Sequence, residues 1–131
     1  MDRMGRDELF YKIIDKDEEN ALCMIDNIEN VNFQDVNGYS YLHAAAQSEL
    51  IEIIKKLLWK GAYIDIKDKF GRTPLMIAVS GYKGDISTIE FLIKHGANPE
   101  MKANSNVSCM QLAKMKGLNL DADTMHPKAT E

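Results

Sequence analysis

The residues of this chain that could perform chemistry are its histidines, cysteines and acidic side chains. His43, His95 and His126 are too far apart to form a His-x-x-x-His zinc pair. Cys23 and Cys109 form neither a metal-binding Cys-x-x-Cys pair nor a disulfide framework. Each cysteine stands among apolar residues, so we expect both to be small buried hydrophobes in a reducing compartment.

Other chemical arrangements are equally incomplete. Asp121 and Asp123 resemble part of a metal site but have too few neighbouring ligands. The sequence has no glycine-rich phosphate loop, and no Ser-His-Asp or Cys-His set can be assembled from it. We therefore expect that the protein is not an enzyme and that it uses no cofactor or metal. For His43 we expect a structural hydrogen bond that joins neighbouring parts of the fold.

Composition and charge indicate one soluble domain. The chain has 131 residues, of which 45% are hydrophobic and 27% are charged. No apolar run approaches the roughly 20 residues that a membrane span needs. The N-terminus lacks the apolar core of a signal peptide, so we expect a cytoplasmic protein with no membrane contact. The net charge is −4, with the acidic excess concentrated in residues 1–35 and a basic excess in residues 55–116. Because the basic residues are spread over several faces, we expect no nucleic-acid binding.

Two similar segments lie 33 residues apart and indicate how the chain is organised. Residues 38–45 read Gly-Tyr-Ser-Tyr-Leu-His-Ala-Ala, and residues 71–78 read Gly-Arg-Thr-Pro-Leu-Met-Ile-Ala. Both segments run on into an apolar stretch that ends in Gly-Ala, at Gly61 and at Gly96. A period in the low thirties is typical of proteins built from stacked structural repeats.

The first copy predicts two helices and an arm. Ser40 is a suitable N-cap for a helix over 41–48, and a helix over 49–60 ends where Gly61 takes the left-handed conformation. Alternating apolar and charged residues in 62–70 favour an extended hairpin arm. Apolar residues at three- and four-residue steps should face the core, namely Leu50, Ile53, Ile54, Leu57 and Leu58.

The second copy repeats this pattern with a longer internal turn. Thr73 is the expected N-cap, and Pro74 occupies the first helical position, where its missing N–H costs nothing. The second helix should span 85–95. The turn over 80–84 is two residues longer than its counterpart, which places Tyr82 on an inserted loop.

Degenerate copies flank these two repeats. Helical spacing recurs in 7–15 and 17–27, with Asp17 as an N-cap, and residues 108–113 resemble the start of another repeat. Terminal repeats are atypical because one face must meet water. We predict a single domain over 1–120, made of a cap at 6–35, repeats at 36–68 and 69–103, and a cap at 104–120, followed by a flexible tail over 121–131.

The repeats resemble the ankyrin family. The family pattern Gly-x-Thr-Pro-Leu-His-x-Ala is matched at Gly71, Thr73, Pro74, Leu75 and Ala78, with Leu92, Gly96, Ala97 and Asn98 further along. The first copy departs from the pattern at Tyr41 and Glu49, where proline and glycine are usual. The resemblance implies an all-α solenoid of about four helix-turn-helix units, including the caps, with hairpin arms on one side. It also implies that the protein binds another protein.

In this family the arm tips and the exposed side of the first helices form a concave binding face. Tyr39, Phe70 and Arg72 are residue types that anchor interfaces, and we expect them to be free for a partner. The alternative for Phe70 is that it folds onto its own arm. Trp59 and Tyr63 should pack half-buried on the outer side, with a second interface as the alternative. The expected partner-binding residues are Val36, Asn37, Tyr39, Gln47, Lys69, Phe70, Arg72, Tyr82, Asn104 and Val107.

The predicted function is non-catalytic protein binding by a chain that is monomeric when free. Small bacterial ankyrin proteins of this kind resemble immunity proteins, so one hypothesis is that the chain neutralises a toxin domain encoded nearby. A second hypothesis is an adaptor or inhibitor of another cellular or host protein. The acidic N-terminal cap is an alternative binding surface to the arm tips.

Overall fold

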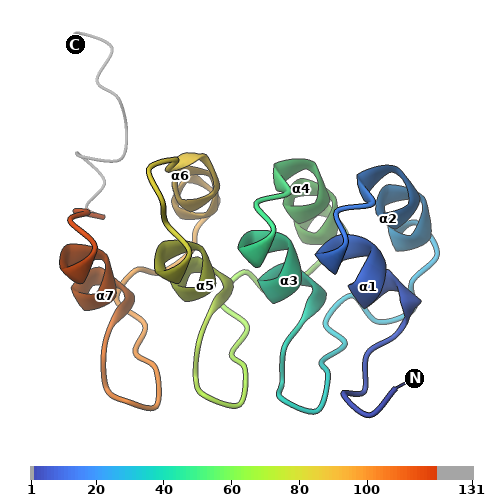
Figure 1. Ribbon diagram of the computed structural model, residues 1–131, viewed down its shortest axis with the longest axis horizontal. Coiled ribbons are helices and arrows are strands. Elements are labelled where there is room, and N and C mark those ends of the chain that lie inside the picture. Colours follow the sequence, from blue (N-terminus) through green and yellow to red (C-terminus); the bar gives the residue numbers. More distant parts are fainter. Residues whose placement is uncertain (1, 121–131) are drawn as a thin grey trace, which may run out of the picture.

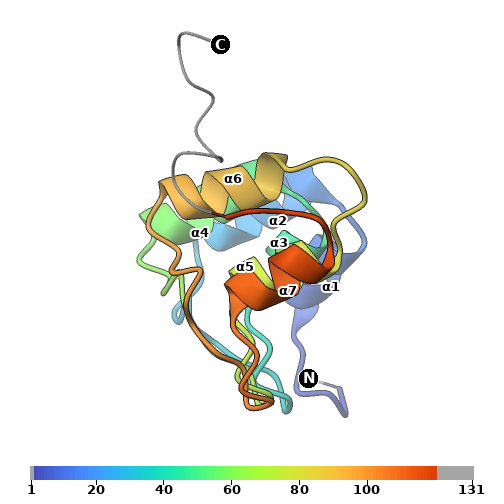
Figure 2. The same cartoon turned by 90° about the vertical axis from the view of Figure 1, so that its left-hand side faces the viewer.

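Seven helices and their connecting arms form a one-dimensional stack in the computed structural model, which describes residues 2–120 (Figure 1). The helices alternate between two rows, and the arms project together on one side of them (Figure 2). The expected all-α repeat fold is confirmed. The elements are α1 (Glu8–Ile14), α2 (Glu18–Ile25), α3 (Tyr41–Gln47), α4 (Ile51–Trp59), α5 (Pro74–Ser80), α6 (Ser87–Lys94) and α7 (Cys109–Met115).

The first helix of each unit begins at a side-chain cap, as the sequence predicts. The Ser40 hydroxyl accepts a hydrogen bond from the backbone N–H of the third helical residue, and Thr73 does the same before Pro74. Asp7 and Asp17 cap α1 and α2 in the same way. These bonds satisfy N–H groups that have no partner inside the helix.

The core lies between successive helix pairs. Leu42, Ile53, Leu57 and Leu75 are fully buried, and α3 packs against both α1 and α5. Leu58 packs against this core as expected, but it is only partly buried. The reason is the helical period, which turns Leu58 about 100° away from Leu57.

The arms are held by turns rather than by continuous strands. Within residues 2–120 the only β-pairing is two isolated bridges, between Gln34 and Ser40 and between Lys102 and Ser108. Neighbouring arms are joined at their tips, where Lys69 N–H donates to the Asn37 carbonyl at 2.8 Å. The expected hairpin arms are therefore closed by turns and isolated bridges instead of continuous strands.

Gly38 and Gly71 permit this close arm contact. Both have positive φ, and a Cβ on Gly38 would lie 2.7 Å from the backbone nitrogen of Lys69. On Gly71 a Cβ would lie 2.8 Å from the backbone nitrogen of Asn104. Glycine is thus needed here both for the turn and for the approach of the next arm.

The outer surfaces differ from the expectation at three residues. Cys23 is exposed, so it is not a core cysteine, whereas Cys109 is buried as predicted. Trp59 and Tyr63 are 80% and 71% exposed, so the expected half-buried packing is wrong. Both side chains lie at the C-terminal end of α4 and the following loop, where no later element covers them.

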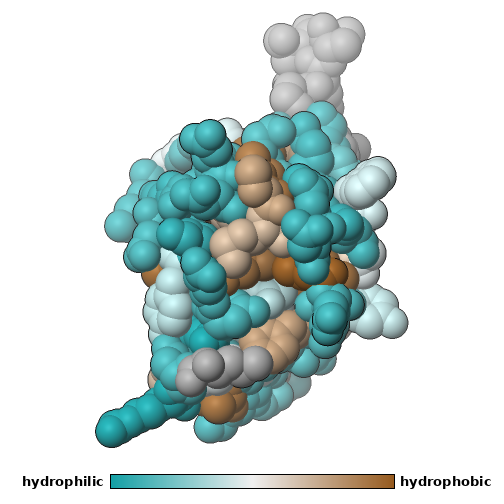
Figure 3. All heavy atoms as spheres, turned by 90° about the vertical axis from the view of Figure 1, so that its right-hand side faces the viewer, coloured by the Kyte–Doolittle hydropathy of each residue, from teal (hydrophilic) through white to brown (hydrophobic). Residues whose placement is uncertain are grey.

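The N-terminal end of the stack is mainly hydrophilic, as expected of a terminal unit. Figure 3 shows this end as hydrophilic atoms crossed by a band of hydrophobic ones. A shallow cavity at the seam between α1 and α2 is lined in part by Leu9, Met24 and Ile28. The predicted tail over 121–131, including Asp121, Asp123 and His126, lies outside the described residues.

Candidate protein-binding groove

Two arms, at residues 35–39 and 68–72, are each organised around one buried carboxylate. They are the second and third arms of the stack, between an N-terminal arm at residues 2–6 and a fourth arm at residues 103–107. One oxygen of Asp35 accepts hydrogen bonds from the backbone N–H groups of Asn37 and Tyr39, at 2.8 and 2.9 Å. Asp68 does the same for Phe70 and Arg72, at 2.9 and 2.8 Å. The two carboxylate side chains have no exposed surface. These bonds fix the backbone of each arm tip and therefore the direction of its side chains.

The second carboxylate oxygen of each aspartate binds an arginine. Arg72 Nε donates to Asp68 within the same arm at 2.8 Å. The corresponding position of the preceding arm is Tyr39, and Arg6 fills the role instead, with its Nε 2.9 Å from Asp35. The N-terminal segment thus supplies the guanidinium that the second arm lacks.

Tyr39 is buried, which corrects the expectation that it is free for a partner. Its side chain is 8% exposed and stacks on His43, with ring centroids 4.9 Å apart. Its hydroxyl donates to Gln47 Oε1 at 2.5 Å. Burial raises the pKa of Tyr39 to about 12, so the hydroxyl stays protonated and can donate this bond at neutral pH.

His43 joins two repeats through the hydrogen bond that the sequence predicts. Its Nε2 lies 2.7 Å from the Arg72 carbonyl, and its Nδ1 accepts from the backbone N–H of Ser40 at 3.0 Å. Both contacts suit a neutral ring protonated on Nε2. Burial lowers the pKa of His43, and the bond to the Arg72 carbonyl acts in the opposite direction. His43 is therefore part of the scaffold.

A groove lies between the arms and the first row of helices, which consists of α1, α3, α5 and α7 (Figure 1). Its largest cavity has a volume of about 430 Å³. It is lined by Arg6, Asn37, Tyr39, Gln47, Phe70, Arg72, Ile77, Ser80 and Gly81. A neighbouring cavity towards the N-terminus includes Lys16, and another towards the C-terminus includes Val107. Five of the residues that we expected to bind a partner thus line one cavity.

Phe70 stands at the rim of this groove. It is 50% exposed, with the Arg72 guanidinium carbon 5.1 Å from its ring centroid and Lys69 Nζ at 5.8 Å. Cations over its face hold the ring without covering it. The tip of the third arm therefore presents an aromatic ring and two positive charges.

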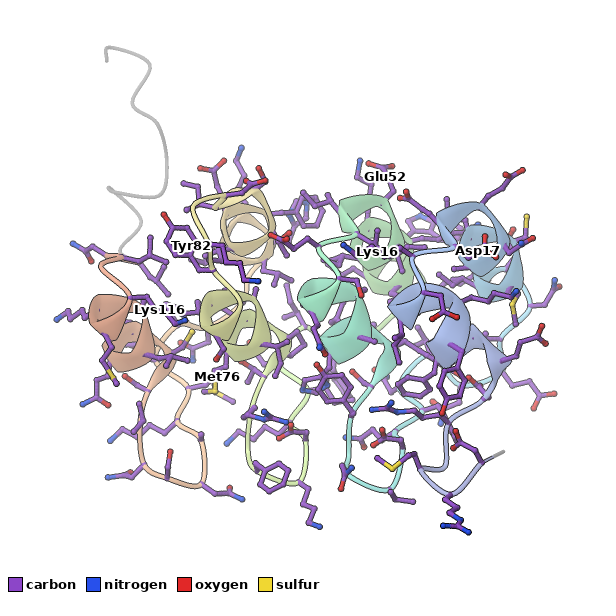
Figure 4. All side chains as sticks on the ribbon, in the orientation of Figure 1. Lys16, Asp17, Glu52, Met76, Tyr82 and Lys116 are labelled. Atoms are coloured by element: carbon purple, nitrogen blue, oxygen red, sulfur yellow. The ribbon has the colours of Figure 1, made fainter. Side chains whose placement is uncertain are left out.

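Of the other expected residues, Val107 lines the cavity towards the C-terminus, whereas Val36, Lys69, Tyr82 and Asn104 line none of the three groove cavities. Val36 is 62% exposed at the second tip. Asn104 bridges the third and fourth arms, since its side-chain amide donates to the Lys69 carbonyl at 2.9 Å. Tyr82 is half-buried on the inserted turn, above α5, where Figure 4 labels it, and it lines none of the three groove cavities.

The sequence reasoning missed Arg6, although the chain carries a signal for it. Residues 2–6 read Asp-Arg-Met-Gly-Arg and residues 68–72 read Asp-Lys-Phe-Gly-Arg, which is an offset of 66 residues, or two periods of 33. The Asp2 carboxylate accepts from the N–H groups of Met4 and Arg6, as Asp68 does in its own arm. The expected start of the cap at residue 6 overlooked this additional arm.

Comparison with known proteins agrees with the repeat geometry. A family model described as "Ankyrin repeats (3 copies)" matches residues 9–103 and, in an overlapping placement, residues 42–122. These matches together cover most of the chain. The protein belongs to the ankyrin-repeat family. Ankyrin repeats generally mediate protein–protein interactions, which is consistent with a groove that is lined by arm-tip side chains, among them the half-exposed Phe70.

Several larger proteins contain similar segments. The chain is 34% identical over 97 residues to serine/threonine-protein kinase 12 of Arabidopsis thaliana, covering 74% of this chain and 21% of the kinase. It is 28% identical over 121 residues to the ankyrin repeat and KH domain-containing protein mask-1 of Caenorhabditis elegans, covering 88% of this chain and 4% of that protein. It is 32% identical over 91 residues to the human BCL-6 corepressor-like protein 1, covering 70% of this chain and 5% of that protein.

These matches span a quarter or less of each relative, so they concern the repeat segments and not the activity of the whole protein. Within residues 2–120 no group of three or more His, Cys, Asp and Glu side chains is placed to hold a metal ion. None of the helices in the same part of the chain has the length and apolar character of a membrane span.

Proposed function

We propose that this ankyrin-repeat protein acts by binding one partner protein in the groove between its arm tips and first helices. The observation that carries the proposal is the cavity that brings Phe70, Arg72 and Arg6 together over a rigid floor. Aromatic and arginine side chains contribute most to binding when they are held in place before the partner arrives. Hydrogen bonds to the buried Asp35 and Asp68 hold both guanidinium groups in this way.

The proposal is tested by affinity purification with the full chain and with a Phe70→Ala variant. A partner recovered by the wild type should be lost, or bound at least about tenfold more weakly, by the variant. A Lys94→Gln variant, altered on the outer helix α6, is the matched control and should recover the partner normally. If Phe70→Ala recovers the partner as well as the wild type does, the groove is not the binding surface.

The specific version of this function is neutralisation of a toxin. It is supported by the resemblance to small ankyrin immunity proteins, in which two regular repeats lie between degenerate caps. The chain would then cover the toxin's active site or substrate groove, in the cytoplasm and as a monomer. Co-expression with the product of the neighbouring open reading frame tests this. A neighbouring product that is harmless alone, or that forms no complex, contradicts the immunity role.

A second candidate is an adaptor or inhibitor of another cellular protein. The relatives favour it, since they include a corepressor-like protein and a KH-domain protein in which similar repeats are a small part of a much longer chain. Mass spectrometry of proteins captured from the host of this gene distinguishes the two candidates. Capture of a regulatory protein with no toxic activity supports the adaptor.

A further inference from the structure

The groove contains two adjacent environments of different chemistry. The central cavity carries two guanidinium groups, whereas the next cavity towards the C-terminus is about 270 Å³ and is lined mainly by apolar side chains. Met76, Val107, Leu112 and Met115 supply most of that apolar lining. Arg72 belongs to both cavities, so the basic and apolar environments meet at its side chain.

The guanidinium groups keep donors for a ligand. Arg6 and Arg72 each use Nε to bind a buried aspartate, and no other side-chain hydrogen bond of either residue is formed within the described chain. An arginine has five N–H donors in a planar fork, so the terminal nitrogens remain for a carboxylate. Asp35 and Asp68 are fully buried and bonded on both oxygens, and their charges offset those of the two arginines without removing the free N–H donors.

Further positive charge surrounds the groove. Lys16, Lys69 and Lys116 make no ion pair among residues 2–120. Lys16 lines the cavity towards the N-terminus, and Lys116 donates to the carbonyl of Ser80, a residue of the central cavity. Figure 4 shows Lys16 and Lys116 at the two ends of the first row of helices.

Among the described residues, no carboxylate lines any of the three groove cavities, whereas Arg6, Arg72 and Lys16 do. Asp7 is occupied by the α1 N-cap bond and by the Tyr41 hydroxyl, and Asp2 is occupied by its arm and the Tyr11 hydroxyl. The exposed carboxylates next in sequence to groove residues are Asp15, beside Lys16, and Glu49, beside Ser48, and neither lines a groove cavity. A ligand in the groove therefore meets an excess of positive charge.

We infer that the groove binds an acidic segment of the partner protein, with carboxylates on Arg6 and Arg72 and an apolar side chain in the cavity between Met76 and Leu112. This inference rests on the proposed function and adds the chemistry of the partner. Charge complementarity selects an acidic segment, because the three lysines at the groove form no ion pair within the described residues and the two arginines keep free N–H donors. The adjoining apolar cavity selects a segment that carries a leucine, isoleucine, methionine or phenylalanine beside its acidic residues.

Selection from a library of random displayed peptides against the immobilised full chain tests the inference. The expected result is enrichment of Asp and Glu beside one large apolar residue. The synthetic consensus peptide is then titrated by fluorescence anisotropy. Arg72→Gln should raise its Kd roughly tenfold and Val107→Asp severalfold, whereas Lys94→Gln should leave it unchanged. Lys69→Gln, which disturbs no buried partner, should raise the Kd about two- to fivefold even if Arg72→Gln is poorly folded.

Other outcomes overturn the inference in distinguishable ways. Enriched peptides that are neutral or basic, or no enriched peptide, contradict the acidic segment, while loss of a purified partner by Phe70→Ala would still support the proposed function. Acidic peptides that bind equally well to all variants contradict both. Tighter binding of a mixed-sequence single-stranded oligonucleotide than of the consensus peptide would overturn the inference in favour of a nucleic-acid ligand.

Discussion

The second and third arms have the same backbone conformation, but they differ in the side chain that follows the glycine of the turn. In both, a buried aspartate accepts the two N–H groups of the tip and a glycine with positive φ turns the chain. The residue after that glycine is Tyr39 in one arm and Arg72 in the other. Tyr39 is buried on His43, whereas Arg72 reaches the groove and holds its own aspartate.

This difference shows how a repeat protein acquires an individual surface. The bonds that form the arm involve backbone groups and the aspartate, so the side chain after the glycine is not needed for the turn itself. Where that side chain is tyrosine, a neighbouring arm must provide the guanidinium, and Arg6 does so. The second arm is therefore tied to the N-terminal segment, while the third is self-contained.

The cores of the two repeats should contribute equally to the free energy of unfolding. Large-to-small substitutions in these cores should have the largest effect of the changes considered. Leu42 and Leu75 occupy equivalent positions and are both buried. Leu42→Ala and Leu75→Ala should each lower the free energy of unfolding by about 2–5 kcal/mol, because each leaves a cavity in the core. Urea denaturation measures the loss, and Val36→Ala at an exposed tip is the control. A small loss for only one leucine would mean that the two repeats are not equivalent.

The two arginines should differ in their contribution to stability. Arg6→Gln should cost about 1–3 kcal/mol, because it leaves Asp35 buried without its charged partner and detaches the N-terminal arm. Arg72→Gln should cost about 1 kcal/mol or less, since the Arg72 side chain is 42% exposed against 23% for Arg6, so that water can take the place of the lost guanidinium beside Asp68. Thermal and urea denaturation measure both variants, with Lys55→Gln as a surface control. A larger loss for Arg72→Gln would reverse the proposed difference between the arms.

Acid should weaken the link between the two arms at His43. Burial lowers the folded-state pKa of His43 below its ordinary value of 6.5, so the unfolded chain takes up this proton first as the pH falls. The His43 contribution is complete above about pH 6.5 and is lost below it, by at most about 1.4 kcal/mol per pH unit for one proton.

The measurement is urea denaturation at several pH values between 5.5 and 7.5. His43→Gln should be less stable than the wild type at pH 7.5 but should lose less stability on acidification. His95→Gln, in which an exposed histidine is replaced, should keep the wild-type slope. An unchanged slope in His43→Gln would show that another group is responsible.

The smallest effect on stability is expected at the tip of the third arm. Phe70→Ala should change the free energy of unfolding by less than about 0.5 kcal/mol, because the ring is half-exposed and the cations of Lys69 and Arg72 over its face also reach solvent. Its effect should instead be on partner binding. A loss of stability comparable with that of Leu75→Ala would place Phe70 in the core and remove it from the binding surface.

Much of the scaffold follows from local sequence alone. The period of 33 residues is visible by comparing the two repeats. Helix ends depend on residues within one turn, as at the N-caps Ser40, Thr73 and Asp17 and at Gly61, which follows the end of α4. The His43 hydrogen bond also follows from the repeat pattern. The internal repeat also carries the signal for the arm at residues 2–6, which the sequence reasoning missed, since these residues match a segment two periods away.

The exposure of individual side chains was decided by tertiary structure. Tyr39 is buried because His43 and Gln47 lie where its ring and hydroxyl point, and Arg6 binds Asp35 across 29 residues of sequence. Three side chains in apolar stretches are less buried than the sequence predicts, namely Cys23, Leu58 and Trp59. The neighbouring helix pairs determine which part of each helix is covered. Sequence period therefore sets the repeat, but burial depends on which residues the neighbouring repeat brings to the same place.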